Sequence, residues 1–320
     1  MYQTETLTAT PQGLARAAAI LRNRELVAFP TETVYGLGGD ARSDIAVARI
    51  FDAKARPHFN PLIVHVPDLA AARDIALFND QALDIAAAFW PGPQTLVLPL
   101  HPTARLADLV TAGLPTVAIR MPAHPIAQAL LRGFGGPLAA PSANPSGRIS
   151  PTRAAHVLDG LSGRIAAVLD GGACAVGVES TILGLGLGLG LNGQPTLLRP
   201  GGIPMESLEA MLGHALQTGG DANKPSAPGQ FASHYAPQAH LRLNVSDPAP
   251  GEIFIGFGPA TLTLSTTRDL VEAAANLFHI LREADHRSGP NGHIAIAPIP
   301  ETGLGRAIND RLRRAAAPRA

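Results

Sequence analysis

The sequence predicts a two-domain α/β protein, in which a large sheet covered by helices is followed by a smaller α/β domain. Apolar runs of strand length alternate with amphipathic helical patterns along most of the chain. A length of 320 residues is enough for two domains that each bury a core. A stretch rich in Gly, Pro, Ser and Asn separates two such regions. We therefore expect a first domain at residues 1–204, a linker at 205–238 and a second domain at 239–320.

The first domain begins with a capped helix and then alternates between strands and helices. Thr10 and Ser43 are N-cap residues in front of helical apolar patterns, and Pro11 suits the first position of a helix. One sheet with helices packed on it is the natural assembly. We expect strands at residues 26–29, 62–66, 95–100, 116–119, 138–140, 167–169 and 196–198, one more strand that opens at 179–181, and helices at about 10–21, 43–51, 68–77, 80–89, 124–133, 152–159 and 205–217.

The second domain has a simpler pattern. Strands are expected at 241–245, 253–257 and 293–297, and helices at about 269–285 and 304–316. Near the end of the first domain, Gly and Leu alternate at 184–191. This run lacks the strand-turn-helix context of a dinucleotide fingerprint, so we expect a surface loop or a hairpin extension there.

Charge and cysteine content exclude several classes of protein. Lys+Arg and Asp+Glu both number 25, so no global attraction to nucleic acid or to an anionic membrane is expected. No apolar run is long enough to span a membrane, and the first residues do not resemble a signal peptide. The single Cys174 excludes an intramolecular disulfide, and a packed, inert thiol is favoured over a reactive one. A cytoplasmic enzyme fits these features.

Polar residues gather where the predicted strands of the first domain end, which is where α/β sheets usually bind ligands. Residues 30–38 combine hydroxyls, a carboxylate and glycines, although an ordinary loop would explain them equally well. Residues 54–61 carry two cations and an amide in a loop stiffened by prolines, with a solvated charged loop as the alternative. His65 interrupts an apolar strand, and such a histidine is more often a hydrogen-bonded core residue than a ligand.

Further polar groups follow later strands. Arg120 ends one strand and could bind a carboxylate or phosphate with two parallel hydrogen bonds. The turn at 141–148 offers hydroxyls and backbone N–H groups to a phosphate, and Arg199 closes the last strand. The sequence contains no P-loop, no Gly-x-Ser-x-Gly elbow and no His-Glu-x-x-His helix. Together these features predict a cation-rich cleft for a polyanion, without a protein nucleophile.

In order along the chain, these segments resemble the Sua5/YrdC/YciO family, and the whole chain resembles its longer, two-domain Sua5 branch. The resemblance covers about 200 residues of the first domain, and the second domain adds a linker motif and a final helix. It rests on PTETVYGLG (30–38), KARPHFNPLIVH (54–65), FWPGPQTLVL (89–98), VAIRMP (117–122), APSANPSGRISPT (140–152), GVESTI (177–182), LLRPGGI (197–203), APGQFASHYAP (227–237) and GLGRAINDRLRRAA (303–316).

The resemblance implies a YrdC-like twisted mixed sheet with helices, followed by a smaller Rossmann-like α/β domain. It also implies an L-threonylcarbamoyladenylate synthase, which converts ATP, L-threonine and bicarbonate to threonylcarbamoyl-AMP and pyrophosphate with Mg²⁺. The product would pass to the tRNA threonylcarbamoyl-transferase machinery for N6-threonylcarbamoyladenosine at position 37. Such chemistry requires alignment of the reactants and neutralisation of charge rather than a protein nucleophile.

The family's binding residues transfer by motif to positions of this sequence. Ala140 stands where some relatives carry a hydroxyl near threonine, which leaves one contact open. Thr33, His65, Arg120 and Ser180 are expected to contact threonine, whereas Lys54, Arg56, Asn60, Thr116, Ser142, Asn144, Ser150 and Arg199 are expected to hold ATP, with Tyr235 closing over the nucleotide. The resemblance thus gives the linker at 219–237 the role of a lid that excludes water.

Two other classes of function stay open at this point. Relatives of this fold have been associated with double-stranded RNA, so an RNA-binding module without catalysis, or an enzyme with weak RNA contact, is an alternative. The neutral charge count argues against the module, because affinity for phosphates needs clustered Lys and Arg. A carrier that binds nucleotide without turnover is the third alternative.

Overall fold

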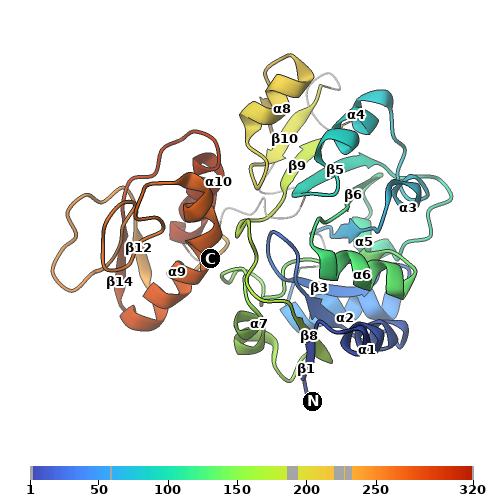
Figure 1. The fold of residues 1–320 in the computed structure, drawn as a ribbon, viewed down its shortest axis with the longest axis horizontal. Coiled ribbons are helices and arrows are strands. Elements are labelled where there is room, and N and C mark those ends of the chain that lie inside the picture. Colours follow the sequence, from blue (N-terminus) through green and yellow to red (C-terminus); the bar gives the residue numbers. More distant parts are fainter. Residues whose placement is uncertain (1–2, 58–59, 186–193, 220–226, 228–232, 319–320) are drawn as a thin grey trace.

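The computed structural model describes residues 3–57, 60–185, 194–219, 227 and 233–318. They form an 11-stranded sheet with helices and, beside it, a 3-stranded sheet with two long helices (Figure 1). The α/β class and the two-domain architecture predicted from the sequence are confirmed. The predicted extension at 184–191 lies almost entirely outside the described residues.

The large sheet is mixed, as expected. Its spatial order is β1-β8-β2-β3-β7-β4-β6-β5-β9-β10-β11. It contains parallel pairs, such as β4 with β6, and antiparallel pairs, such as β5 with β6. The strands are β1 (Glu5–Thr8), β2 (Val27–Phe29), β3 (Gly36–Asp40), β4 (Ile63–His65), β5 (Gln94–Pro99), β6 (Thr116–Arg120), β7 (Leu138–Ala139), β8 (Ala167–Asp170), β9 (Thr181–Gly184), β10 (Thr196–Arg199) and β11 (Gln217–Thr218).

Two helices of the first domain, α1 and α2, begin at the caps that the sequence indicated. The Thr10 hydroxyl accepts from Gly13 N, and the Ser43 hydroxyl accepts from Ala46 N, which satisfies otherwise unpaired N–H groups. The helices are α1 (Pro11–Arg22), α2 (Asp44–Lys54), α3 (Leu69–Arg73), α4 (Asp80–Phe89), α5 (Asp108–Thr111), α6 (Pro125–Phe134), α7 (Ala154–Leu161) and α8 (Met205–Leu212).

Three strands were not predicted. β1 is a half-exposed edge strand that pairs only with β8, and β3 has the Gly-rich sequence GLGGD, which is more typical of a turn. β11 follows α8, which ends at Gly213 rather than near residue 217, and pairs with β10. The expected linker at 205–238 therefore starts with helix α8, followed by a strand of the first sheet. Most of its remainder, 220–226 and 228–232, lies outside the described residues, so its role as a linker stays a prediction.

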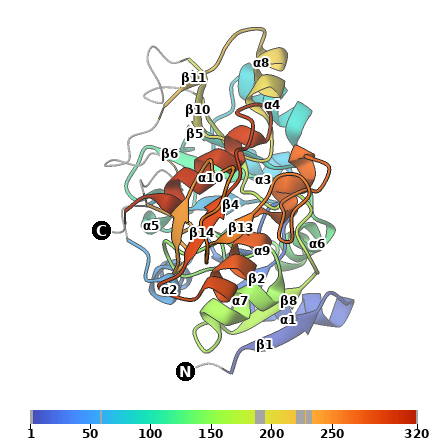
Figure 2. The same cartoon turned by 90° about the vertical axis from the view of Figure 1, so that its left-hand side faces the viewer.

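The second domain is built on three parallel strands. β12 (His240–Arg242), β13 (Ile253–Ile255) and β14 (His293–Ile296) are arranged in the order β12-β14-β13, with α9 (Leu270–Ser288) and α10 (Gly305–Ala316) alongside. When the molecule is turned, this domain lies in front of the first one (Figure 2). A parallel sheet with helices is the small Rossmann-like arrangement that was expected.

The two domains share an apolar core. Val34, Ile149 and Val178 of the first domain belong to the same buried cluster as Leu277 and Phe278 of α9. Burial of apolar surface is the main favourable contribution to such docking. The second domain is thus packed directly against the segments that, as described next, surround the pocket.

Candidate active site

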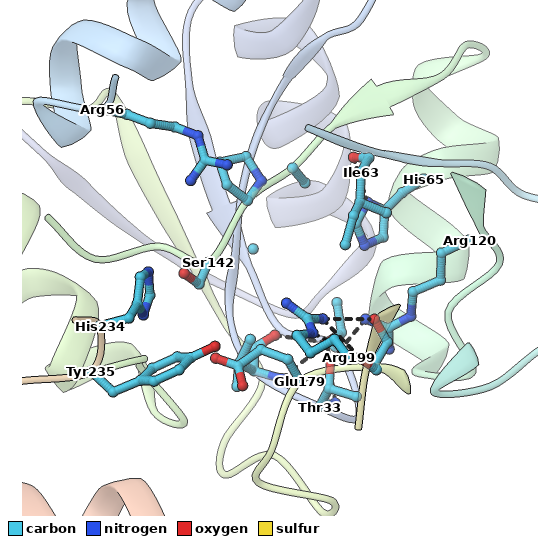
Figure 3. A pocket seen from close by; sticks show the side chains of 16 residues that line it. Thr33, Arg56, Ile63, His65, Arg120, Ser142, Glu179, Arg199, His234 and Tyr235 are labelled. Atoms are coloured by element: carbon cyan, nitrogen blue, oxygen red, sulfur yellow. Dashed lines mark hydrogen bonds between the residues drawn. The ribbon is translucent and has the colours of Figure 1, made fainter. Parts of the chain in front are cut away.

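A pocket lies where several strand ends of the first domain meet the His234–Tyr235 segment. In the close view, Arg120 and His65 lie on one side of it and Arg56 and His234 on the other, with Arg199 between them (Figure 3). The predicted residues that line it are Thr33, Arg56, His65, Arg120, Ser142, Ser180, Arg199 and Tyr235. Its cavity volume is about 50 Å³, below the roughly 300–1,000 Å³ of typical ligand pockets. The free space between these side chains is therefore small.

Arg120 is held in place by three first-domain groups. Its side chain is 4% exposed; Nη2 donates to Glu32 Oε1 at 2.5 Å, Nη1 to the Thr33 hydroxyl at 2.9 Å and Nε to the Gly92 carbonyl at 3.3 Å. Burial alone would raise the pKa of the Glu32 carboxyl, but the charge and hydrogen bond of Arg120 lower it. A guanidinium has five N–H groups, so one N–H on each terminal nitrogen stays available to a ligand.

His65 lies beside Arg120 at the end of β4. The neighbouring strands place the two residues directly opposite each other, and His65 Nδ1 is 3.3 Å from the Ile63 carbonyl oxygen. Burial, and then the nearby Arg120 charge, lower the pKa of His65 to about 3. The imidazole is therefore neutral at physiological pH and can offer a hydrogen bond without adding charge.

Ser180 directly precedes β9 and Arg199 is the last residue of β10, and the two residues link these strand ends. Arg199 donates to the Ser180 carbonyl from Nε at 3.2 Å and from Nη2 at 2.8 Å, and Nη2 also reaches the Ser180 hydroxyl at 3.2 Å. That hydroxyl is 2.7 Å from the Thr95 hydroxyl. Gly201 permits this close approach, because a Cβ at that position would lie 2.4 Å from the carbonyl carbon of Ser180.

Arg56 and Lys54 bring further positive charge to the same region. Arg56 donates to the carbonyl oxygens of Asn60 and Pro61, at 3.3 and 2.9 Å. Burial, and then repulsion from Arg199, lower the pKa of Arg56 to about 9, so it is still charged at pH 7. The pKa of Lys54 also falls well below its ordinary value because of burial and the Arg56 charge. Like charges this close and this buried favour an anionic ligand.

Five residues expected at the ATP site do not line the pocket. Lys54 Nζ donates to the backbone carbonyls of Ser142 and Asn144, so it supports the 142–144 turn from behind. The Asn144 amide donates to carbonyls of its own loop, and the Ser150 hydroxyl donates to Glu179 Oε1 at 2.5 Å. Asn60 and Thr116 are buried outside the lining. The pocket as it stands does not bring these five side chains together with the others.

Glu179 and Arg311 were not predicted as site residues, although both lie in the motifs that carry the resemblance. Arg311 of α10 donates from Nε to Glu179 Oε2 at 2.9 Å, and its Cζ is 5.6 Å from the centre of the Tyr235 ring. Burial alone would raise the pKa of the Glu179 carboxyl, but Arg311 and then Arg199 lower it. The only local indication of this ion pair was the carboxylate of Glu179 directly before Ser180. Its partner Arg311 lies 132 residues further along the chain, and nothing in the local sequence pointed to it.

Several buried polar atoms around the pocket lack a hydrogen-bond partner. They include Asn60 Oδ1, Asn144 Oδ1 and His234 Nδ1. Unpaired buried polar atoms are costly and uncommon in native proteins. Of these three residues only His234 lines the pocket, where its free ring nitrogen is suited to a polar ligand.

Two negative findings concern the described residues only. None of their helices is both long and apolar enough to cross a membrane. They contain no cluster of three or more His, Cys, Asp or Glu side chains suited to a metal ion. Cys174 is buried, and burial above all raises its pKa to about 12, as expected of an inert thiol.

Comparisons with known proteins cover almost the whole chain. Residues 19–201 match the Sua5/YciO/YrdC family, described as telomere recombination, and residues 203–317 match the threonylcarbamoyl-AMP synthase C-terminal domain. The threonylcarbamoyl-AMP synthase of Bacillus subtilis is 43% identical over 338 aligned positions, which cover 98% of this chain and 95% of that protein. The enzyme of the same name from Pyrococcus abyssi is 40% identical, with 93% and 92% covered.

A solved structure agrees with these sequence matches. The crystal structure of Pyrococcus abyssi Sua5 complexed with L-threonine superimposes with a TM-score of 0.87 at 37% identity, covering 98% of this chain and 97% of that one. Both domains are thus matched in sequence and in structure, and the chain belongs to the Sua5/YciO/YrdC family, in its two-domain branch.

Proposed function

We propose that this protein is a threonylcarbamoyl-AMP synthase, a nucleotidyltransferase that joins carboxylated threonine to AMP. The overall reaction is ATP + L-threonine + bicarbonate giving threonylcarbamoyl-AMP, pyrophosphate and water. One observation carries the assignment: the same pocket is lined by two sets of cations, Arg56 with Arg199 and, across from them, Arg120. The full-length similarity to proteins of that name supports the same conclusion.

Arg120 is assigned to the threonine carboxylate. Its remaining N–H groups suit two parallel hydrogen bonds to a carboxylate, while Glu32 and Thr33 fix its orientation. Neutral His65 and the hydroxyls of Thr33 and Ser180 can then contact the amine and the side chain of threonine. Because each of these groups is buried and hydrogen-bonded, little ordering is required when threonine binds.

Arg56 and Arg199 are assigned to the triphosphate. Their mutual repulsion in a buried site is relieved when phosphate oxygens bind between them. The amine of threonine takes up CO₂ from bicarbonate to form a carbamate, whose oxygen attacks the α-phosphorus as pyrophosphate leaves. The protein supplies alignment and positive charge rather than a nucleophile, and closure of the pocket keeps water from the carbamate and the mixed anhydride.

Mg²⁺ is proposed as a partner of ATP rather than as a protein-bound metal. Glu32 and Glu179, the carboxylates next to the pocket, are already paired with Arg120 and Arg311. The residues the structure describes thus do not offer an open carboxylate cage there. Mg²⁺ commonly keeps several waters and binds substrate phosphates, which is sufficient here.

The product is a mixed anhydride that must be consumed before it hydrolyses. We propose that it passes to the tRNA threonylcarbamoyl-transferase machinery in the cytoplasm, for modification of adenosine 37, with at most weak RNA contact by this chain. Similarity to named synthases over both domains favours the enzyme over the alternative of a double-stranded RNA-binding module.

The test is pyrophosphate release by the purified protein with ATP, Mg²⁺, L-threonine and bicarbonate. Release should depend on both threonine and bicarbonate, because only the complete reaction needs the carbamate. Omission of either reactant, and replacement of L-threonine by D-threonine, are the matched controls. Release that is unaffected by threonine would indicate an ATP pyrophosphatase and would reject the proposed function.

A further inference from the structure

Arg311 is a residue of the second domain whose side chain contacts the first domain as well as Asp310 of its own helix, to which its Nη1 donates at 2.9 Å. It lies on α10 with its side chain 1% exposed. Its Nε donates to Glu179 Oε2 at 2.9 Å, its Nη1 donates to the Pro200 carbonyl at 2.5 Å, and its guanidinium lies over the Tyr235 ring. One side chain therefore joins the segment that leads into β9, the end of β10 and the segment that covers the pocket.

The first-domain groups that Arg311 contacts are chain neighbours of pocket residues. Glu179 directly precedes Ser180, and Pro200 directly follows Arg199. Arg199 is hydrogen-bonded to Ser180, so the two strand ends behave as one unit. Arg311 contacts this unit from the second domain. A shift of α10 would move this unit relative to the rest of the pocket.

Arg311 also determines which cation Glu179 neutralises. Glu179 lines the pocket together with Arg199, and each of the two side chains affects the pKa of the other. With Arg311 in place, one carboxylate oxygen of Glu179 is bound to Arg311 and the other to the Ser150 hydroxyl. If the Arg311 charge were absent, Glu179 would be left with Arg199, the other guanidinium that acts on this carboxyl. An unpaired buried charge is strongly unfavourable, so the carboxylate would attract Arg199.

We propose that Arg311 is a positioning residue for the ATP side of the pocket: it pairs with Glu179 and so keeps this carboxylate from drawing Arg199 away from the phosphates. This inference rests on the proposed function, since it takes the ligand beside Arg199 to be a triphosphate. It gives the second domain a direct part in the reaction, because helix α10 supplies the charge that balances a pocket carboxylate.

The experiment compares four variants with the wild-type enzyme in the pyrophosphate assay: Arg311→Met, Glu179→Gln, the double variant Glu179→Gln/Arg311→Met, and Arg313→Met. Methionine keeps much of the length of arginine without its charge. Arg313 is the matched control, because it is on the same helix but pairs with Glu301 on the surface, where both side chains are more than half exposed. KM and kcat are measured separately for ATP and for threonine, and thermal unfolding is recorded for each variant.

Arg311→Met should raise KM for ATP about tenfold or more, the cost of losing one good charge–phosphate contact, and should change KM for threonine much less. In the Glu179→Gln background the same substitution should change KM for ATP less than about threefold, because no carboxylate is left to capture Arg199. Arg313→Met should behave as wild type. If Arg311 had a purely structural role, Arg311→Met would lower the unfolding temperature, and Glu179→Gln would not reduce its effect on KM for ATP.

The inference is wrong if Arg311→Met has the same KM for ATP as the control Arg313→Met. It is also wrong if Arg311→Met raises KM for ATP by the same factor in the wild-type enzyme and in Glu179→Gln. Should Arg311→Met fail to fold, Arg311→Lys replaces it in the same cycle, with a smaller expected rise. A wild-type enzyme that releases no pyrophosphate would reject the proposed function instead. In that case the dissociation constants for ATP, measured by calorimetry on the same variants, decide the role of Arg311 separately.

Discussion

Replacement of Arg120 by lysine tests the threonine side of the pocket most directly. The guanidinium uses three N–H groups on Glu32, Thr33 and the Gly92 carbonyl, which leaves two for a ligand carboxylate. A lysine ammonium has only three N–H groups in total and cannot present two of them in parallel to one carboxylate. In Arg120→Lys the ammonium group therefore either loses its hydrogen bonds to the protein or binds the ligand carboxylate through a single hydrogen bond.

The magnitude follows from the loss of one charge-assisted hydrogen bond in a buried site. Such a bond contributes about 1.5–3 kcal/mol, so the dissociation constant for threonine should rise by about 10- to 150-fold. The affinity for ATP should change much less, because Arg56 and Arg199 are unaltered. Isothermal titration of each substrate gives both constants without relying on turnover.

The control is Arg73→Lys, which makes the same chemical change at an exposed position on α3. Thermal unfolding of both variants separates binding from stability, since the Glu32 carboxyl also loses part of its pairing. If Arg120→Lys binds threonine as tightly as wild type, Arg120 does not bind the carboxylate and the assignment is refuted.

Three further predictions concern other parts of the molecule. Arg56→Ala should lower kcat/KM for ATP by about 10- to 150-fold, through loss of a charge–phosphate bond; steady-state kinetics in a folded variant with unchanged kcat/KM would remove Arg56 from the site. Burial lowers the pKa of both His65 and His234 to about 3. Because the unfolded chain binds protons that the native state excludes, each of these histidines should lower the free energy of unfolding by about 1.4 kcal/mol per pH unit as the pH falls below about 6.5. Urea titrations should show this slope reduced in His65→Asn, and an identical slope in that variant would contradict the buried, neutral imidazole. Phe278→Ala should cost about 3–5 kcal/mol of unfolding free energy because the ring is fully buried against Tyr235; calorimetry showing a loss below about 1 kcal/mol would mean that this contact does not hold the domains together.

The sequence predicted strongly patterned elements well and weakly patterned ones poorly. β2, β4 and β6 are short apolar runs that end in turn or charged residues, and each is found within two residues of its expected bounds. β3 was missed because its glycines have no strand preference of their own; its antiparallel pairing with β2 and β7 imposes the extended form. β11 was missed because its two residues are exposed and only β10 defines them as a strand.

The site shows the same division between local and long-range information. The motifs located Arg56, Arg120 and Arg199, because each follows or precedes a recognisable strand. They could not show that Lys54 supports a turn through two carbonyls rather than lining the pocket, since this depends on where residues about ninety positions later fold back. Arg311 was missed for the same reason, because it reaches Glu179 and Pro200 only when the second domain packs against the first.

The apolar cluster shared by both domains also has a consequence during synthesis of the chain. Val34, Ile149 and Val178 are completed long before Leu277 and Phe278, which cover them in the native structure. About a hundred residues separate Val178 from the end of the α9 segment, and at about 5–20 residues per second their translation takes roughly 5–20 s. During that interval the nascent first domain exposes an apolar patch next to its incomplete pocket. Ribosome-bound chains stopped before α9 should therefore recruit holdase chaperones that chains extended through α10 no longer need.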